Sequence, residues 1–134
     1  CVPEHPVARL AKVRRKDLAG VSFLSLDRRH HSYVQVRDAC EQLGATLLED
    51  YEGTSLDSLR QMCGSGLGFA LLPELYLRSE AGGENMVGRR TIAGWSPSRS
   101  SAGAWRNGPA YAEHFRVISQ AVANEARRIL AKPF

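Results

Sequence analysis

Two groups of polar residues in this sequence have types and positions suited to holding a small ligand. They are His30, His31, Ser32, Thr54 and Ser55. The first three follow a short apolar run of strand length, and the last two precede a segment with helical spacing. A hydroxyl at the start of a helix lies beside free backbone N–H groups and the positive end of the helix dipole, which favours an anion. Simple N-capping is an equally good role for either hydroxyl.

The paired histidines offer imidazole nitrogens at the end of a predicted strand, where open α/β sheets bind ligands. Such a pair has the chemistry to sense pH, to hold an anion or to bind a metal. A metal needs a third ligand, and neither His5 nor His114 is near in sequence. We therefore expect no metal site. A solvated turn is the simpler role for His31, whereas His30 is the better choice for a pocket residue.

The motifs of common enzymes are missing from the sequence. It has no Gly-x-Ser-x-Gly and no His-Glu-x-x-His. Gly66-x-Gly68 follows a predicted helix rather than a strand, which is the wrong context for a dinucleotide site. Helix termination and close packing explain these glycines better. We expect neither catalysis nor a cofactor.

The chain has three cysteines, Cys1, Cys40 and Cys63. An odd number without Cys-x-x-Cys spacing argues against a disulfide framework and against structural zinc, so reduced cytoplasm is the expected compartment. Cys40 falls on the apolar face of a predicted helix, where a thiolate is disfavoured. Packing is therefore the simpler role for Cys40, and likewise for Cys63.

Composition indicates an ordinary globular domain of 134 residues, 43% hydrophobic and 24% charged. The net charge of +4 comes from basic residues scattered in pairs without interleaved aromatics, so a nucleic-acid surface is the less favoured interpretation. No apolar run approaches the ~18 residues of a membrane span. The first residues lack an initiator Met and a signal peptide, so we expect a piece of a longer protein.

Hydrophobic periodicity predicts alternating strands and helices. Strands are expected at 21–26, 46–51, 67–72 and 91–95, with the 67–72 strand in the middle of the sheet because it is apolar throughout. A helix with Ser32 as N-cap is expected to end at Gly44, and a second is expected with Thr54 as N-cap and Asp57 at N3. A short helical turn follows at 73–78, and a long final helix begins at Pro109. This order predicts an α/β fold with a mainly parallel sheet flanked by helices, plus a long C-terminal helix.

The segment from Gly53 to Pro73, GTSLDSLRQMCGSGLGFALLP, resembles the regulatory domain of LysR-type transcriptional regulators. In that family a Thr or Ser opens a helix, a Gly-x-Gly follows, and an apolar strand ends in Leu-Pro. The N-terminal VPEHPVA resembles the family's hinge strand and the loop after it, and RRTI at 89–92 resembles the second hinge strand. The resemblance implies a periplasmic-binding-protein-like fold, a small-molecule effector expected to be anionic, and homo-oligomers (a dimer, or a tetramer in the full-length regulator). It also implies contact with DNA only through an N-terminal winged helix-turn-helix absent from this chain.

Within the family the sequence is most similar to the OxyR peroxide-sensor branch, through LDRRHH at 26–31. In those sensors a His precedes the peroxide-reactive Cys, and a second Cys lies nine residues further on. Here His30 matches the His and Cys40 the second Cys, while His31 occupies the reactive position. An imidazole cannot form a sulfenic acid or condense with Cys40, so the usual disulfide switch is chemically unavailable to this chain. Cys40 stays a redox candidate only as an alternative.

The resemblance also implies how the chain is divided. Residues 1–90 correspond to the second, effector-binding regulatory lobe, and 91–134 to the return strand and C-terminal helix of the first lobe. Without its partner strands that helix would expose its apolar stripe, so we expect it to pack on another copy or to fold back. The functional hypotheses are an effector sensor, a residual redox switch and a purely structural dimerisation module.

Overall fold

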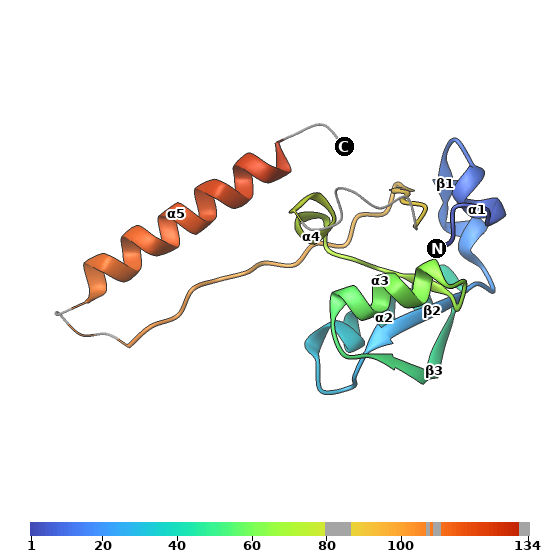
Figure 1. The fold of residues 1–134 in the computed structure, drawn as a ribbon, viewed down its shortest axis with the longest axis horizontal. Coiled ribbons are helices and arrows are strands. Elements are labelled where there is room, and N and C mark those ends of the chain that lie inside the picture. The colour runs from blue at the N-terminus through green and yellow to red at the C-terminus, as the bar shows by residue number, and fades with distance from the viewer. Residues whose placement is uncertain (80–86, 107, 109–110, 132–134) are drawn as a thin grey trace. The chain divides into compact units, whose positions relative to one another are not determined.

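The computed structural model describes residues 1–79, 87–106, 108 and 111–131. The chain forms two compact units. Unit 1 comprises Cys1–Leu72 with Gly83–Ser96, and unit 2 comprises Pro73–Gly82 with Pro97–Phe134. Figure 1 shows residues 1–72 of unit 1 in blue to green, and the long helix α5 of unit 2 in orange to red. None of the described helices is long and apolar enough to cross a membrane.

Unit 1 is built on a three-stranded parallel sheet in the order β3-β2-β4. The strands are β2 (Ser22–Leu26), β3 (Thr46–Gly53) and β4 (Phe69–Ala70). The predicted parallel α/β arrangement is therefore confirmed. The prediction that 67–72 forms the middle strand is wrong, because β4 pairs with β2 alone and lies at an edge among the described residues. The central strand is β2, where four of five residues are buried.

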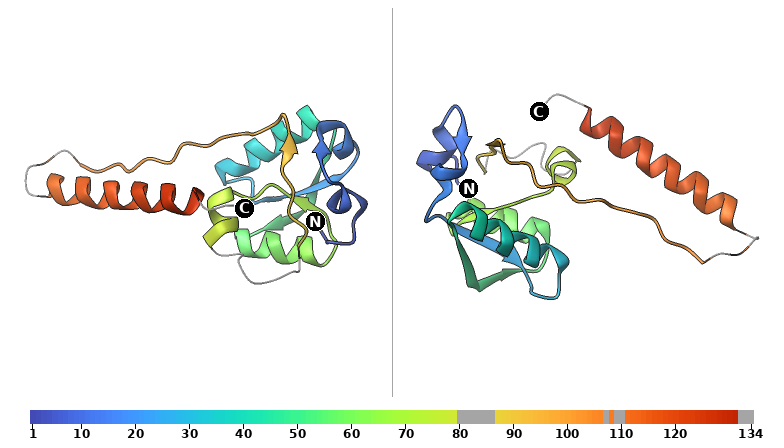
Figure 2. Two further views of the ribbon diagram at one scale, coloured as in Figure 1. Left: turned by 90° about the horizontal axis from the view of Figure 1, so that it is seen from above. Right: turned by 180° about the vertical axis from the view of Figure 1, so that it is seen from behind.

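Two helices cover opposite faces of this sheet. They are α2 (His31–Leu43) and α3 (Leu56–Gly64). Neighbouring residues of a strand point to opposite faces. Phe23 packs with Val36, Cys40 and Leu43 of α2, while the next residue, Leu24, packs with Leu59 and Cys63 of α3. Unit 1 thus has three layers, with the sheet between the helices (Figure 2, left).

The register between β2 and β3 is interrupted. Ser22 and Phe23 lie opposite Thr46 and Leu47, but Ser25 and Leu26 lie opposite Glu52 and Gly53. β3 therefore advances five residues while β2 advances two, and residues 48–51 form a bulge. The bulge lies on the strand that forms one edge of the sheet.

Helix α2 begins earlier than its sequence predicted. Its N-cap is His30, and Ser32 lies inside the first turn rather than at the cap. The reason is a turn at Asp27, whose carbonyl accepts the His30 N–H at 2.9 Å. This turn starts the helical winding before the chain reaches Ser32. The predicted end is confirmed: Gly44 follows the helix at φ +66°, a left-handed conformation that favours glycine.

Helix α3 begins one residue later than predicted: β3 ends at Gly53, and the N-cap is Ser55, whose backbone is extended (φ −151°, ψ 168°). The Ser55 hydroxyl accepts the Ser58 N–H at 3.1 Å, and the Ser58 hydroxyl accepts the Ser55 N–H at 3.0 Å. The capping box is thus made by two serines, and the predicted pair Thr54 and Asp57 is wrong.

The N-terminal segment adds a small second sheet to unit 1. Its elements are α1 (Pro6–Arg9), β1 (Val13–Arg14) and the 3₁₀ helix η1 (Arg15–Leu18), and β1 pairs in parallel with β5 (Ile92–Ala93). Val13 and Leu18 are buried in the cluster that α2 covers. The Trp95 indole N–H donates to Gln42 Oε1 at 3.1 Å and ties the chain after β5 to α2. The strand predicted at 91–95 is therefore present but shorter.

Unit 2 contains α4 (Glu74–Ser79), the exposed segment 97–106 and α5 (Ala112–Leu130). The first helical residue of α5 is Ala112, and Pro109, predicted at that position, lies outside the described residues. The predicted apolar stripe is present on α5 and stays exposed: Phe115 by 43%, Ile118 by 57% and Val122 by 64%.

Candidate functional site

The loops that follow β2 and β3 meet at the carboxyl edge of the sheet. Leu26 lies opposite Gly53, and the Asp27 N–H donates to the Gly53 carbonyl at 3.3 Å. The predicted site residues leave these two strand ends: His30, His31 and Ser32 after β2, and Thr54 and Ser55 after β3. The structure therefore brings both predicted groups to one edge, where Ser32 is half-buried and the other four are exposed.

The two hydroxyls of the second loop differ in their freedom to bind a ligand. The Ser55 hydroxyl already accepts the Ser58 N–H, so its structural role as a cap is shown. Thr54 is exposed and precedes the cap by one residue. Of the two, Thr54 is the one whose hydroxyl can contact a ligand without opening the first turn of α3.

A compact turn holds the first loop. The Asp27 carboxylate accepts the Arg29 backbone N–H at 2.8 Å and the Arg29 guanidinium at 2.9 and 2.7 Å. These bonds from Arg29 hold the pKa of Asp27 well below its usual range. The carboxylate is therefore ionised at neutral pH, and its contribution to the turn is lost only when the pH falls through this depressed pKa.

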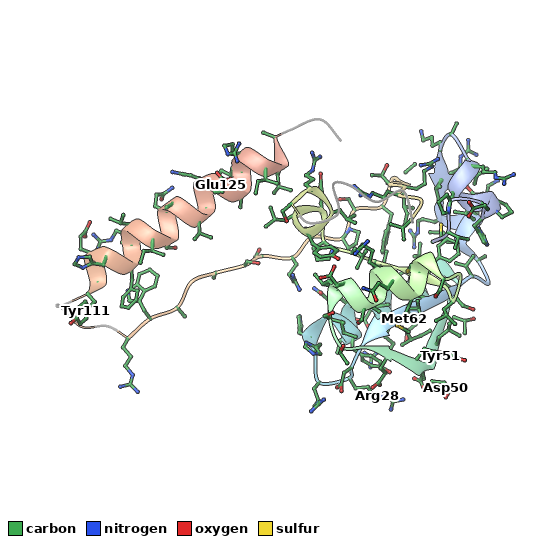
Figure 3. All side chains as sticks on the ribbon, viewed as in Figure 1. Arg28, Asp50, Tyr51, Met62, Tyr111 and Glu125 are labelled. Carbon is green, nitrogen blue, oxygen red and sulfur yellow. The ribbon has the colours of Figure 1, made fainter. Side chains whose placement is uncertain are left out.

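A second cluster at the same edge is one that the sequence did not reveal. Arg28 Nη2 lies 3.1 Å from Glu49 Oε2, and Arg28 Nε lies 3.7 Å from Glu52 Oε1. The Tyr33 hydroxyl donates to Glu49 at 3.2 Å, and the Arg28 guanidinium lies 5.8 Å from the centre of the Tyr33 ring. Figure 3 shows Arg28 beside β3 and its neighbours. Because the charged side chains are 60% (Arg28), 58% (Glu49) and 38% (Glu52) exposed, each ion pair contributes at most about 1 kcal/mol.

The charges of the edge constrain what binds there. Arg29 is paired with Asp27, and Arg28 is shared by Glu49 and Glu52. An incoming anion must take Arg28 from a carboxylate or rely on hydroxyl, imidazole and backbone N–H donors. Among the described residues no group of three or more His, Cys, Asp or Glu side chains is placed to hold a metal ion.

The two cysteines of the helices are buried in different layers. Cys40 is 4% exposed on α2 and Cys63 is 2% exposed on α3, and the sheet separates them. Burial raises the pKa of both thiols, which disfavours the reactive thiolate. A disulfide needs Cα atoms within about 7 Å, so Cys40 and Cys63 cannot join across the intact sheet.

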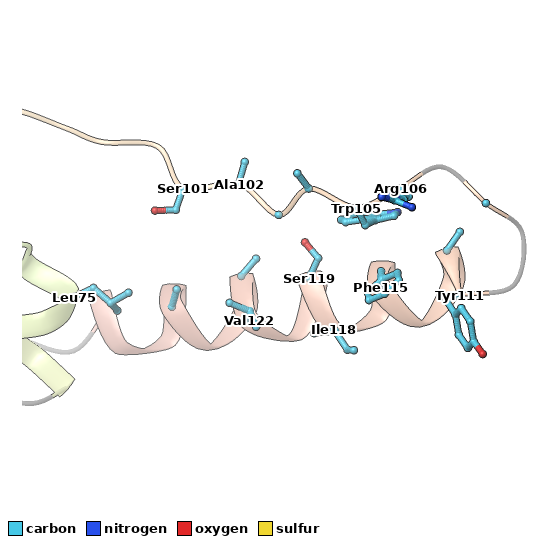
Figure 4. Close-up of a pocket in the computed structure, with 16 residues that line it drawn as sticks. Leu75, Ser101, Ala102, Trp105, Arg106, Tyr111, Phe115, Ile118, Ser119 and Val122 are labelled. Atoms are coloured by element: carbon cyan, nitrogen blue, oxygen red, sulfur yellow. The ribbon is translucent and has the colours of Figure 1, made fainter. Parts of the chain in front are cut away.

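Unit 2 has a cavity of its own along α5. Its volume is about 980 Å³, and apolar side chains dominate its lining, among them Leu75, Trp105, Phe115, Ile118 and Val122 (Figure 4). The Trp105 ring stacks on Phe115 with centroids 6.1 Å apart. The segment before α5 thus runs along the helix, and the residues of the apolar stripe stay partly exposed beside it.

The sequence of the chain matches a known family. Residues 1–127 match the family model described as the LysR substrate binding domain. The chain belongs to this family. The periplasmic-binding-protein-like fold class expected from the sequence is thereby confirmed for this LysR domain.

Curated relatives of this LysR domain are transcription regulators by name. It is 31% identical to the hydrogen peroxide-inducible genes activator of Haemophilus influenzae over 128 residues, which cover 94% of this chain and 42% of that protein. It is 29% identical to the DNA-binding transcriptional dual regulator OxyR of Escherichia coli K12 over 119 residues, 89% of this chain and 39% of that protein. The chain thus spans about two fifths of the length of these relatives. No solved structure matches it.

Proposed function

We propose that this LysR domain senses a small effector for a DNA-bound transcription regulator and has no catalytic activity. The observation that carries the proposal is the family match over residues 1–127. The structure supports it by bringing the predicted ligand groups to one edge of a parallel sheet, where α/β proteins bind ligands. An effector that prefers one arrangement of the lobes shifts the population of the regulator toward that arrangement.

The effector that we propose is small and anionic. Thr54 and the start of α3 offer hydroxyl and N–H donors, and His30, His31 and Ser32 offer donors from the other loop. Ser55 supports the site by capping α3. The Arg28 Nε becomes available to an anion if Glu52 releases it, while Nη2 stays with Glu49, because the 3.7 Å contact with Glu52 is the longer of the two ion pairs.

The arrangement of the whole regulator is part of this proposal. Residues 1–90 form the second, effector-binding lobe, and 91–134 supply the return strand and C-terminal helix of the first lobe. The regulator acts in the cytoplasm as a homo-oligomer, as a dimer or tetramer, and its winged helix-turn-helix domain, outside this chain, selects the DNA sequence. The exposed stripe of α5 agrees with a helix that packs on another part of the regulator or on another copy.

A ligand that binds the folded state raises the melting temperature. We expect a panel of small carboxylates, phosphate and sulfate to contain compounds that raise the melting temperature. A compound that binds only the folded state shifts the unfolding equilibrium toward that state. Thr54→Val removes the hydroxyl at constant size, and His30→Gln removes the imidazole. Either variant should weaken binding of a positive compound by about tenfold, the effect of one lost hydrogen bond to a charged group. The melting shift and isothermal titration measure this loss.

Matched controls lie elsewhere in the chain. Thr46→Val changes an exposed threonine at the start of β3, the opposite end of the same strand, and His114→Gln changes an exposed histidine on α5. Both should bind the positive compound as the parent does. If no compound of the panel raises the melting temperature, or if Thr46→Val weakens binding as much as Thr54→Val, the proposed site is refuted.

The alternatives are a redox switch through Cys40 and a purely structural dimerisation module. The names of the relatives motivate the first. We expect stoichiometric peroxide to leave the Cys40 and Cys63 thiols unmodified, as peptide mass and thiol labelling after unfolding would show, because both are buried and have raised pKa values. A thiol reagent should modify half-buried Cys1 quickly and the other two only on unfolding. A Cys40 disulfide formed at low peroxide would instead establish the redox role. A molecular mass that rises with protein concentration, without any change of melting temperature on adding ligand, would favour the dimerisation module.

A further inference from the structure

Six cationic side chains gather at the N-terminal end of unit 1. We name them the basic end; they are Arg9, Lys12, Arg14, Arg15, Lys16 and Arg90. All six are exposed. In the sequence five of them look like a scattered stretch and the sixth lies far along the chain, so only the fold shows that they belong to one surface.

The fold of the N-terminal segment explains this grouping. Val13 and Leu18 are buried in the core below α2, which turns the cationic residues between them outward. Arg90 joins them because its Nε donates to the Leu10 carbonyl at 3.3 Å, and because β5, which follows it, pairs with β1. Arg15 donates to the Gln42 carbonyl at 2.9 Å, which anchors the surface to α2.

These six charges lack carboxylate partners among the described residues. Four other arginines of unit 1 show a contrast: Arg28, Arg29, Arg37 and Arg60 each form an ion pair with an acidic residue. The Asp17 carboxylate, close in sequence, accepts the Arg14 backbone N–H at 2.8 Å. The acidic residues of β3 lie at the opposite end of unit 1 (Figures 1 and 2). The basic end therefore presents concentrated positive charge to solvent.

We infer that the basic end binds the phosphate backbone of duplex DNA, without reading its sequence. Protein interfaces need an apolar centre, and Leu10, 37% exposed, is the large apolar side chain that this surface offers. Long cationic side chains without aromatic neighbours suit phosphates, which attract them through charge and the release of counterions. The inference adds a second DNA contact to the one expected through the N-terminal domain, and it does not depend on the proposed effector.

The phosphate contacts predict a defined salt dependence. Six cations that neutralise phosphates give a slope of log K against log salt of about −5, and non-specific dissociation constants are typically about 10⁻⁴–10⁻⁶ M. We expect fluorescence anisotropy of a labelled random-sequence duplex to show such binding by the full chain, and to show its loss between about 50 and 200 mM salt.

Charge reversal locates the contact. The double variant Arg14→Glu/Arg15→Glu should weaken DNA binding at least about tenfold, and Arg14→Gln/Arg15→Gln should reduce the salt slope by about 2. The control Arg127→Glu/Arg128→Glu changes net charge by the same amount on α5 and should bind nearly as the parent does. Circular dichroism checks that each variant is folded. Because Arg15 also anchors the surface, Lys12→Gln/Lys16→Gln provides a second test at positions without such a bond.

Three outcomes would overturn the inference. The first is no binding of the duplex at the lower salt concentration. The second is equal weakening by the reversals at 14/15 and 127/128, which would show a response to net charge alone. The third is binding of poly-glutamate as tight as that of DNA at equal charge, which would assign the surface to an acidic protein partner.

Discussion

Leu24→Ala is expected to lower the free energy of unfolding by about 2–5 kcal/mol, the range for a large core side chain cut back to alanine. Leu24 is fully buried in the central strand β2. Its side chain lies among Leu59 and Cys63 of α3 and the partly buried Leu48 and Ala70 of the neighbouring strands. Few nearby groups can move inward without breaking the sheet, so the cavity would remain.

Urea unfolding followed by far-UV circular dichroism measures the effect. Leu67→Ala is the matched control, since Leu67 is 41% exposed between α3 and β4. It should cost less than about 1 kcal/mol, as substitutions of exposed residues usually do. Equal losses for the two variants would contradict the placement of β2 at the centre of the core.

Gly68→Ala is expected to destabilise unit 1 by about 1–3 kcal/mol or more, as overpacking does. A Cβ at this position would lie 2.8 Å from the Ser22 carbonyl oxygen and 3.3 Å from Leu24 Cγ. The first neighbour is backbone and cannot rotate away. β4 would have to move off β2 at the pairing of Phe23 with Phe69.

The same urea experiment tests this prediction. The control is Gly108→Ala, where an added Cβ meets no atom of the described residues within 4 Å. That variant should leave stability unchanged or raise it slightly, because alanine makes the unfolded chain less flexible than glycine does. A neutral Gly68→Ala would mean that β4 is not held against β2 as closely as the structure has it.

The alternation of strands and helices was predictable because burial sets a strong period in the sequence. Phe23 and Leu24 point to opposite faces of the sheet, and the apolar residues of α2 recur at regular helical spacing. The helix starts were not predictable to the residue. Whether Ser32 or His30 caps α2 depends on the Asp27 turn, a local competition among several polar side chains that a periodic pattern does not resolve.

The candidate site was predictable in outline and not in its charges. Parallel strands end at one edge, so residues after β2 and β3 were expected together. The pairing of Arg28 with Glu49 depends on the bulge in β3, which moves Glu52 opposite Ser25. Hydrophobic spacing gives no sign of that bulge. The grouping of Arg90 with Arg14 likewise needs the pairing of β1 with β5, a long-range contact.

The bulge at 48–51 also bears on how this domain avoids aggregation. β3 is an outer strand, and a long regular outer strand offers its unpaired N–H and C=O groups to strands of other molecules. Here the strand is bent, and Glu49 and Asp50 place exposed negative charge along it. A second copy that approached strand to strand would meet an irregular hydrogen-bonding pattern and like charges. Strand-to-strand self-association through β3 is therefore disfavoured.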